Sequence, residues 1–489
     1  MNKIIYKNKM EFQKFETYTY VEDKHVSYLK QLEDFVQKSS FLPHYHLYPK
    51  TGLMNDPNGL AYFNKQYQFF YQWFPLEPHH GMKHWGHYKS SDLVHWEDKK
   101  IALIPDEEYE KNGCYSGNSI EKDGLLYLFY TANYKTPQGK IPKQAVAIMD
   151  KVGVIQKSKK NPIIDGAPEG MSGEIRDPFV FKRDGSYYML LGAKDEHEVG
   201  QLLLYTSQDL IDWVYQGIIS LPIDKGYMLE CPSLIQVEGK DVLIVSVMGL
   251  EKEETRYQNQ FSTIYLVGKL DISNKVFYEE YSDEVDSGFD FYASQAFYGK
   301  NNVPMMVAWF GCGQQELPSD KDMWKHGLTM PYELKLKQNR LTHFVASELL
   351  EQFKKKQSFH NEKITTKSNT YHLSFEVCNH KDEMSIKFGY LKDYWELKFD
   401  FNRDHISVDR SNLDIPVDVQ NGKIRKTKGL NKNRYQVDVF VDNSFVEIFI
   451  NEGEKSFAFR AFNMTTQHHD VIFGWEAIGE IAYYQAVGF

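Results

Sequence analysis

The sequence is poor in cysteine and has no long apolar run. Only four cysteines occur among 489 residues, at positions 114, 231, 312 and 378, so no CxxC pattern predicts a zinc site or a redox pair. The charged N-terminus lacks the apolar segment of a secretory signal, and no apolar run reaches the length of a membrane span. These absences predict a cytoplasmic protein with free thiols, no membrane association and no metal or other cofactor.

Basic residues are also in deficit. The 57 Lys and Arg against 67 Asp and Glu give a net charge of −10. A nucleic-acid-binding protein needs a basic face, so no nucleic-acid partner is expected, although a local basic pocket is still compatible with a small anionic substrate. Aromatic residues, by contrast, make up 15% of the chain, which suits strands and surfaces that stack on sugars. Nothing in the sequence indicates the oligomeric state.

The middle of the chain repeats one pattern five times. An apolar run, a short polar turn and a second apolar run recur, with 54 to 62 residues between successive turns. Each unit reads as a β-hairpin, and five such units predict an all-β fold with a five-bladed β-propeller over 41–335. A β-sandwich with fortuitous spacing is the alternative. The turns fall near Asn64, Asp123, Asp184, Glu238 and Lys300.

The two ends of the chain differ from this repeat. Residues 1–40 predict a helical arm, because Val26, Leu29, Leu32 and Phe35 share one face of a helix over 21–38. Residues 336–357 read as a linker in which a short helix is possible. Strand patterns without the propeller period predict a separate β-sandwich over 358–489, with a hairpin turn at 442–443.

Polar groups precede each hairpin turn at the same phase. In the first, third and fourth units these groups include Asp56, Asp177 and Glu230. Taken singly, the segments are explained by a tight turn, an ion pair or a solvated strand end. Taken together, they would meet at one mouth of a propeller channel, and three carboxylates in an aromatic-lined funnel are typical of a site that cleaves glycosides.

The same segments resemble the conserved blocks of glycoside hydrolase family 32, the invertase and β-fructofuranosidase family. The resemblance covers about 43–489 and implies the propeller-plus-sandwich fold. The block HLYPKTGLMNDPNGL resembles the nucleophile block, and SFVEIFIN (444–451) resembles a segment of the C-terminal sandwich. The intervening blocks follow in the family's order: FYQWFP (70–75), YSGNS (115–119), RDP (176–178), ECP (230–232), FDFYASQ (289–295) and VAWFG (307–311).

The resemblance implies a retaining, double-displacement mechanism. Asp56 would be the nucleophile, Glu230 the general acid and base, and Asp177 the transition-state stabiliser. Arg176 would keep its neighbour Asp177 ionised. The residues expected to line the sugar site are Asn55, Gln72, Trp85, Tyr115, Ser116, Arg176 and Tyr292.

One segment departs from the general family pattern. Leu53 stands where many relatives have Trp, and HHGMKHWGH (79–87) resembles the bacterial sucrose-6-phosphate hydrolase branch, whose members act in the cytoplasm. A phosphate on the leaving glucosyl unit needs basic groups, and His80, Lys83 and His84 are the candidates for this role. The interpretation as ordinary surface or packing residues stays open for each of them.

Other functions remain compatible with the sequence. Within the family, the chain could be an invertase, a fructan hydrolase or a fructosyltransferase acting on unphosphorylated fructosides. An inverting arabinan-type glycosidase is disfavoured, since its motifs differ. A fructoside-binding protein without turnover would be free to lose one of the three carboxyls, and an interaction scaffold would not need them at one mouth.

Overall fold

The computed structural model describes residues 12–360, 362–379, 381–417, 419–463, 468–474, 480–487 and 489. The predicted turns are hairpin turns: Asn64, Asp123, Asp184, Glu238 and, one residue after the predicted Lys300, Asn301 have left-handed backbone angles. Among residues with a side chain, Asn and Asp tolerate this conformation best. The hairpins join β1 (Gly52–Phe63) to β2 (Gln66–Phe74), β5 (Ser119–Lys122) to β6 (Leu125–Ala132), β12 (Met171–Arg183) to β13 (Ser186–Asp195), β16 (Met228–Val237) to β17 (Lys240–Met248), and β20 (Tyr292–Tyr298) to β21 (Pro304–Trp309).

Further strands extend each hairpin into an antiparallel sheet of four or five strands. In chain order they are β3 (His84–Ser90), β4 (Trp96–Leu103), β9 (Lys143–Met149), β10 (Ile155–Lys157), β11 (Ile164–Asp165), β14 (Gly200–Ser207), β15 (Val214–Ile219), β18 (Phe261–Asp271), β19 (Val276–Glu284), β23 (Tyr332–Lys337) and β24 (Arg340–Val345). Outside these sheets lie the hairpin of β7 (Lys135–Thr136) and β8 (Gly139–Lys140) and the 3₁₀ helices η2 (Glu108–Glu110), η3 (Lys300–Asn302) and η4 (Pro318–Asp322).

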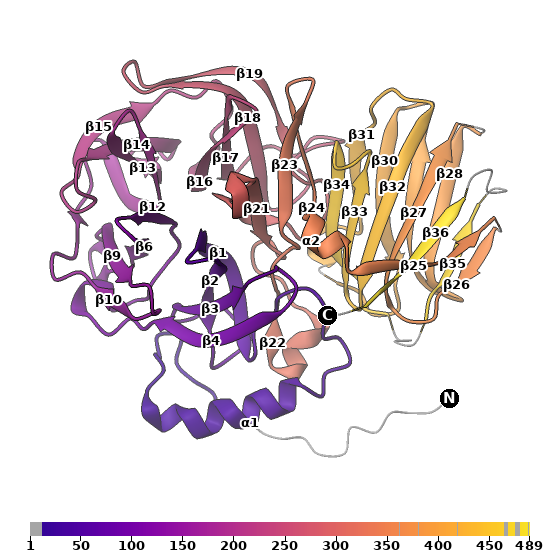
Figure 1. Ribbon diagram of the computed structural model, residues 1–489, viewed down its shortest axis with the longest axis horizontal. Coiled ribbons are helices and arrows are strands. Elements are labelled where there is room, and N and C mark those ends of the chain that lie inside the picture. The colour runs from indigo at the N-terminus through magenta and orange to yellow at the C-terminus, as the bar shows by residue number, and fades with distance from the viewer. Residues whose placement is uncertain are drawn as a thin grey trace.

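The innermost strands close a ring. β1 contacts β5 and β20, and β12 and β16 complete the circuit (Figure 1). The all-β fold predicted from the sequence is confirmed, and each repeat forms one sheet of the ring. A short strand, β22 (Trp324–Lys325), comes back from beyond the fifth hairpin and pairs in parallel with the start of β1, so the first sheet contains strands from both ends of the propeller.

The propeller ends later than the predicted boundary at 335. The strands β23 and β24 pair with each other and complete the fifth sheet up to Val345, so the interpretation of 336–345 as linker is wrong. The segment was misleading because it forms the outer hairpin of its sheet and exposes Lys335, Lys337 and Asn339 to solvent. The short helix α2 (Ser347–Leu350) then connects the propeller to the C-terminal strands.

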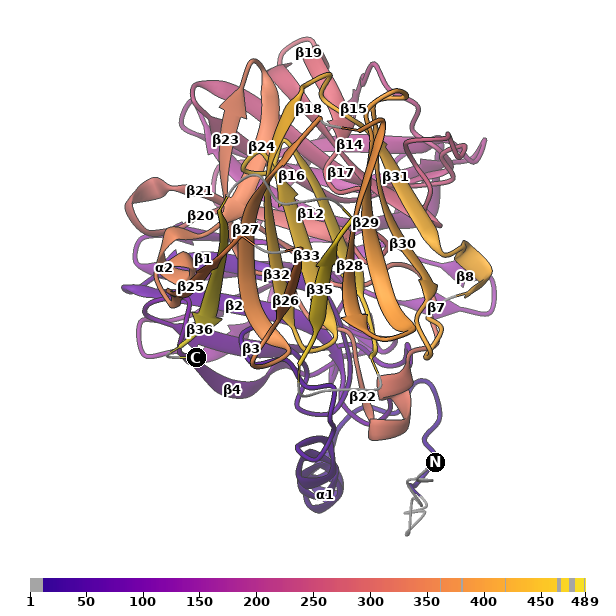
Figure 2. The same cartoon turned by 90° about the vertical axis from the view of Figure 1, so that its right-hand side faces the viewer.

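The C-terminal strands form a β-sandwich of two six-stranded sheets around a separate apolar core (Figure 2). One sheet contains, in spatial order, β25 (Phe353–Phe359), β36 (Ile481–Ala486), β27 (Thr370–Cys378), β32 (Arg434–Asp442), β33 (Phe445–Ile450) and β34 (Lys455–Arg460). The other contains β26 (Lys363–Thr365), β35 (Asp470–Phe473), β28 (Glu383–Tyr390), β29 (Asp393–Asp400), β30 (His405–Asn412) and β31 (Ile424–Lys428), with η5 (Val419–Asn421) before β31.

The N-terminal arm contains one short helix, as predicted, although residues 1–11 lie outside the described part of the chain. The 3₁₀ helix η1 (Asp23–His25) leads into α1 (Val26–Val36). Leu32 and Val36 are buried against the propeller, and Leu29 and Phe35 are partly buried. Val26 was expected on the same face, but it begins the helix and is 61% exposed.

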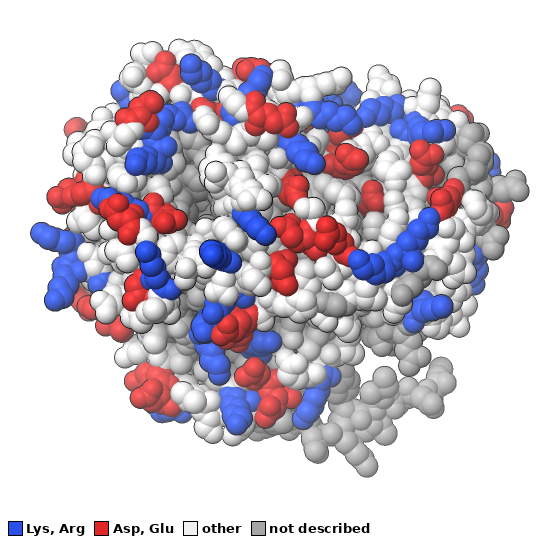
Figure 3. Space-filling view, in the orientation of Figure 1, with Lys and Arg blue, Asp and Glu red and all other residues white. Residues whose placement is uncertain are grey.

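The charged side chains of the molecule are of mixed sign on the face seen in Figure 3. Figure 3 shows acidic and basic side chains interspersed on one face, and neither sign forms a continuous field among the described residues drawn there. No described helix has the length and apolar character needed to cross a bilayer.

A buried ionic cluster joins the sandwich to the segment that leads into β1. The Asp442 carboxylate accepts hydrogen bonds from the backbone N–H groups of His44, Tyr45 and His46, at 2.6 to 2.9 Å. The His46 ring lies 2.9 Å from Asp442 Oδ2 and 3.2 Å from Glu447 Oε1, and all three side chains are buried. The hairpin of β32 and β33 thereby fixes the backbone at residues 44–46, in the segment that leads into β1 and Asp56.

The charge of His46 is expected to make stability depend on pH. Burial alone lowers the pKa of His46, but hydrogen bonds to Asp442 and Glu447 outweigh this effect and raise the pKa to about 9. A raised pKa means that the contribution is complete below the unfolded value near 6.5 and is lost as pH rises through about 9; the shift corresponds to about 3 kcal/mol. Thermal unfolding measured from pH 6 to 10 should show this loss in the wild type and not in His46→Gln. Parallel pH profiles for the two proteins would contradict the assignment.

Candidate active site

Four of the innermost strands carry a β-bulge at the same level. The pairing register shifts after Met54 in β1, after Arg176 in β12, after Glu230 in β16 and after Tyr292 in β20. A bulge leaves one residue unpaired and re-aims the side chains next to it. The repeated bulge therefore explains why the polar groups before each turn, which share a phase in the sequence, meet at one mouth of the channel.

The carboxyl group of Asp56 is held by neutral donors. Its Oδ2 accepts hydrogen bonds from Ser116 Oγ at 2.5 Å and Gln72 Nε2 at 3.3 Å, and its Oδ1 accepts one from Asn55 Nδ2 at 2.9 Å. Burial raises the pKa of Asp56, whereas the bonds from Ser116 and Asn55 and the positive charge of Lys83 oppose this shift. The predicted residues Asn55, Gln72 and Ser116 thus lie around the predicted nucleophile.

Both carboxyl oxygens of Glu230 accept a hydrogen bond. Arg176 Nε donates to Oε1 at 2.9 Å, and the buried Tyr292 hydroxyl donates to Oε2 at 2.7 Å. A second nitrogen of the Arg176 guanidinium bonds Glu174, which is also bonded by Lys140 from β8. Glu174 bonds the guanidinium of Arg176 directly, and Lys140 holds Glu174 in place. Neither residue belongs to a motif that the sequence analysis identified.

Asp177 lies against the backbone of the strand that carries Glu230. Its Oδ2 accepts a hydrogen bond from Cys231 N at 3.0 Å, and the Cys231 sulfur lies 3.5 Å from this oxygen and 3.7 Å from Asp56 Oδ2. The backbone of both Asp177 and Cys231 is left-handed, which costs a non-glycine residue about 1–3 kcal/mol and is often found at functional sites.

The expectation that Arg176 keeps Asp177 ionised is wrong for this structure. The guanidinium is hydrogen-bonded to Glu230 and Glu174. Burial and the nearby charge of Glu230 raise the pKa of Asp177 more than the positive charge of Arg176 lowers it. Asp56 and Asp177, the two carboxyls that contact Cys231, therefore both have a raised pKa.

A buried lysine completes the site on the side of Asn55. Lys83 Nζ donates to Asn55 Oδ1 at 2.7 Å and lies 3.2 Å from His80 Nδ1. Burial lowers the pKa of Lys83 to about 7, an effect that the charge of Asp56 partly opposes. Lys83 was expected near a phosphate, but its ammonium lies between the sugar-site amide and His80.

Two predicted contact residues are packing residues. His84 is fully buried, one ring nitrogen lies 3.1 Å from Met82 O and the other accepts the Val21 N–H, so no ring atom is free for a phosphate. Trp85 is also fully buried, and its indole N–H donates to Tyr115 O at 2.9 Å. Trp85 therefore holds the backbone of the segment that precedes β5, while Tyr115 itself stays partly exposed.

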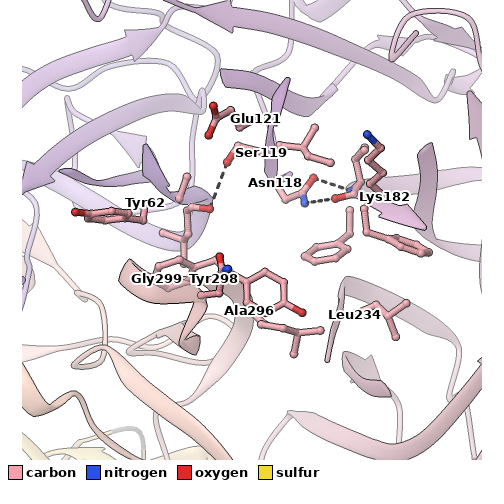
Figure 4. Close-up of a pocket in the computed structure, with 18 of the residues that line it drawn as sticks. Tyr62, Asn118, Ser119, Glu121, Lys182, Leu234, Ala296, Tyr298 and Gly299 are labelled. Carbon is pink, nitrogen blue, oxygen red and sulfur yellow. Dashed lines mark hydrogen bonds between the residues drawn. The ribbon is translucent and has the colours of Figure 1, made fainter. Parts of the chain in front are cut away.

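The opposite end of the channel has a different chemistry. A cavity of about 580 Å³ opens there, lined by Tyr62, Ser119, Lys182, Leu234 and Tyr298 near the far ends of the five innermost strands (Figure 4). Glu121 is the one carboxylate among the described residues that line it. Bond cleavage by paired carboxyls is thus possible at the bulged end of the strands and not at this one.

The bulged end supports acid–base and nucleophilic chemistry. One carboxyl is surrounded by neutral donors, and a second is held by an arginine and a tyrosine, which gives the two groups different surroundings as a double displacement requires. No group of three or more His, Cys, Asp or Glu within the described ranges is arranged to hold a metal ion.

Comparisons with known proteins agree over nearly the whole chain. Sucrose-6-phosphate hydrolase of Bacillus subtilis is 34% identical over 443 residues, which are 87% of this chain and 90% of that protein. The Staphylococcus xylosus protein of the same name is 32% identical over 92% of this chain and 93% of its own length.

Solved structures show the same architecture. The structure of sucrose-6-phosphate hydrolase from Lactobacillus gasseri superposes with a TM-score of 0.91 at 30% identity and covers 96% of this chain and 98% of its own. A GH32 β-fructofuranosidase of Bombyx mori, solved as a mutant in complex with sucrose, gives a TM-score of 0.79 at 26% identity and covers 95% and 100%. The family models for the N-terminal and C-terminal domains of glycosyl hydrolases family 32 match residues 46–346 and 339–477, and the chain belongs to this family.

Proposed function

We propose that this glycoside hydrolase is a retaining β-fructofuranosidase that hydrolyses sucrose 6-phosphate. The observation that carries the proposal is the convergence of Asp56, Asp177 and Glu230 at one mouth of the channel, where Cys231 contacts the first two directly. Names of the relatives support the phosphorylated substrate. Sucrose phosphorylated during uptake occurs in the cytoplasm, and the proposal places the protein there.

The reaction proceeds in two displacements. Asp56 attacks C2 of the fructosyl unit while Glu230 gives a proton to the glycosidic oxygen, and glucose 6-phosphate leaves. Glu230, now a carboxylate, takes a proton from water, and the resulting hydroxyl attacks C2 and releases fructose from Asp56. Asp177 accepts hydrogen bonds from ring hydroxyls and stabilises the positive charge that develops on the fructosyl ring in the transition state of each displacement.

Side-by-side kinetics on sucrose 6-phosphate and sucrose test the substrate. We expect kcat/KM to be at least about 100-fold higher for the phosphorylated sugar, which corresponds to about 2.7 kcal/mol of additional transition-state binding. Glucose release from sucrose and glucose 6-phosphate release from the phosphorylated sugar are measured by the same coupled assay at one pH. Equal values would instead indicate a general β-fructofuranosidase, and turnover of neither would contradict the proposal.

A further inference from the structure

A second cavity lies beside the carboxyl cluster, in the crease between the propeller and the sandwich. Its volume is about 660 Å³. Four separate parts of the chain line it: the segment after β2 with His80, the segment 314–316 with Glu316, the segment around β22 with Lys325 and His326, and the connection before β31 with Gln420. We call this space the crease cavity.

The crease cavity adjoins the site on the side of Glu230. The His80 ring packs edge-on against Trp309, with ring centroids 5.9 Å apart. Trp309 in turn packs against Tyr292, whose hydroxyl holds the Glu230 carboxyl. Glu230 is the proposed acid, so the group that it protonates departs toward this side of the channel.

The wall of the cavity contains basic side chains. Lys325 is 7% exposed, and its ammonium lies 2.9 Å from Asp320 Oδ2. Burial and the positive charges of Lys83 and Lys325 hold the pKa of His80 well below its ordinary value. His80 is therefore an uncharged hydrogen-bonding ring near neutral pH, and the positive charge of the lining is that of Lys325.

A buried histidine in the same wall lacks a partner. Both ring nitrogens of His326 have no hydrogen-bond partner among the described residues, and the side chain is fully buried. A buried polar group without a partner costs about 1–3 kcal/mol. The ring nitrogens of His326 are covered by neighbouring atoms, so this histidine borders the cavity without facing it directly.

We propose that the crease cavity binds the phosphate monoester of the leaving group, with Lys325 as the ionic anchor and His80 as a hydrogen-bonding residue of the wall. This inference rests on the proposed function. A phosphate monoester carries between one and two negative charges near neutral pH, and a lysine binds it as a point charge. Lys325 lies outside every motif of the sequence. Of the three candidates named from the sequence, His80 lines the cavity, whereas Lys83 and His84 do not.

The test compares Lys325→Met with Lys321→Met, an exposed lysine of η4 that does not line the cavity. The measured quantity is the ratio of kcat/KM for sucrose 6-phosphate to that for sucrose. We expect Lys325→Met to lower this ratio by about 30-fold or more, while Lys321→Met keeps the wild-type ratio. Thermal unfolding of each variant shows whether it is folded.

Product binding supplies a readout that does not depend on turnover. We expect glucose 6-phosphate to bind the wild type more tightly than glucose does by calorimetry, and His80→Gln or Lys325→Met to lose this difference. If the wild type prefers the phosphorylated sugar and folded Lys325→Met keeps that preference, the phosphate lies elsewhere and only this inference fails. If the wild type has no preference, the proposed substrate itself is wrong.

Discussion

Asp56→Asn should lower kcat by about 10⁴-fold or more, which corresponds to a loss of at least about 5.5 kcal/mol of transition-state stabilisation. An amide cannot form the fructosyl ester, so the double displacement stops at its first step. The amide keeps the size of the carboxyl and its place beside Ser116, Gln72 and Asn55.

The stability of Asp56→Asn, unlike its activity, is expected to stay the same or to increase. Burial raises the pKa of Asp56, so a charged Asp56 destabilises the folded protein as pH rises, and Asn removes this cost. We therefore expect an unfolding temperature equal to or above that of the wild type at pH 7. Asp123→Asn, the same change at an exposed hairpin turn, serves as the control for activity. Activity of Asp56→Asn within tenfold of the wild type would rule out the nucleophile assignment.

Glu230→Gln should lower kcat/KM on sucrose 6-phosphate by about 10²–10⁴-fold, the usual contribution of a general acid. Glutamine can still contact Arg176 and Tyr292 but has no acidic proton to give to the glycosidic oxygen. The loss should therefore be much smaller on an aryl β-fructofuranoside, whose phenolate departs without protonation.

A second readout concerns the step in which water attacks. Azide needs no general base, so added azide should accelerate turnover of the aryl substrate by Glu230→Gln and give a fructosyl azide of retained configuration. Equal losses on both substrates, with no effect of azide, would assign Glu230 a structural role.

The features that sequence reasoning predicted are local or periodic. The hairpin turns follow from Asn, Asp and Gly at positions that need left-handed backbone, and Asp56, Asp177 and Glu230 could be chosen because they share a phase with those turns. The propeller is then predicted from the number of repeats, since each hairpin can bury both of its faces only by packing between two neighbouring hairpins.

The features that escaped prediction depend on contacts between distant segments. Arg176 was assigned to its neighbour Asp177, but the bulge in β12 turns the guanidinium toward Glu230 in the next sheet. Trp85 was placed in the wall of the site because an aromatic residue suits a sugar, yet burial depends on how two sheets pack. Lys325 belongs to no sequence motif, and it lies near the site only because β22 pairs with the start of β1.

The pairing of β22 with β1 also bears on how the protein is made. Gly52 lies beside Trp324, and Gly52 N–H donates to Met323 O at 2.8 Å. The N-terminal part of the chain leaves the ribosome first. Four more hairpins are therefore synthesised before β22, the strand that pairs with the inner edge of β1, exists. Ring closure is a late event with high contact order, and until it occurs the edge of β1 is open to wrong pairing. Nascent chains stalled before residue 324 are thus the species in which chaperone dependence and aggregation should be concentrated.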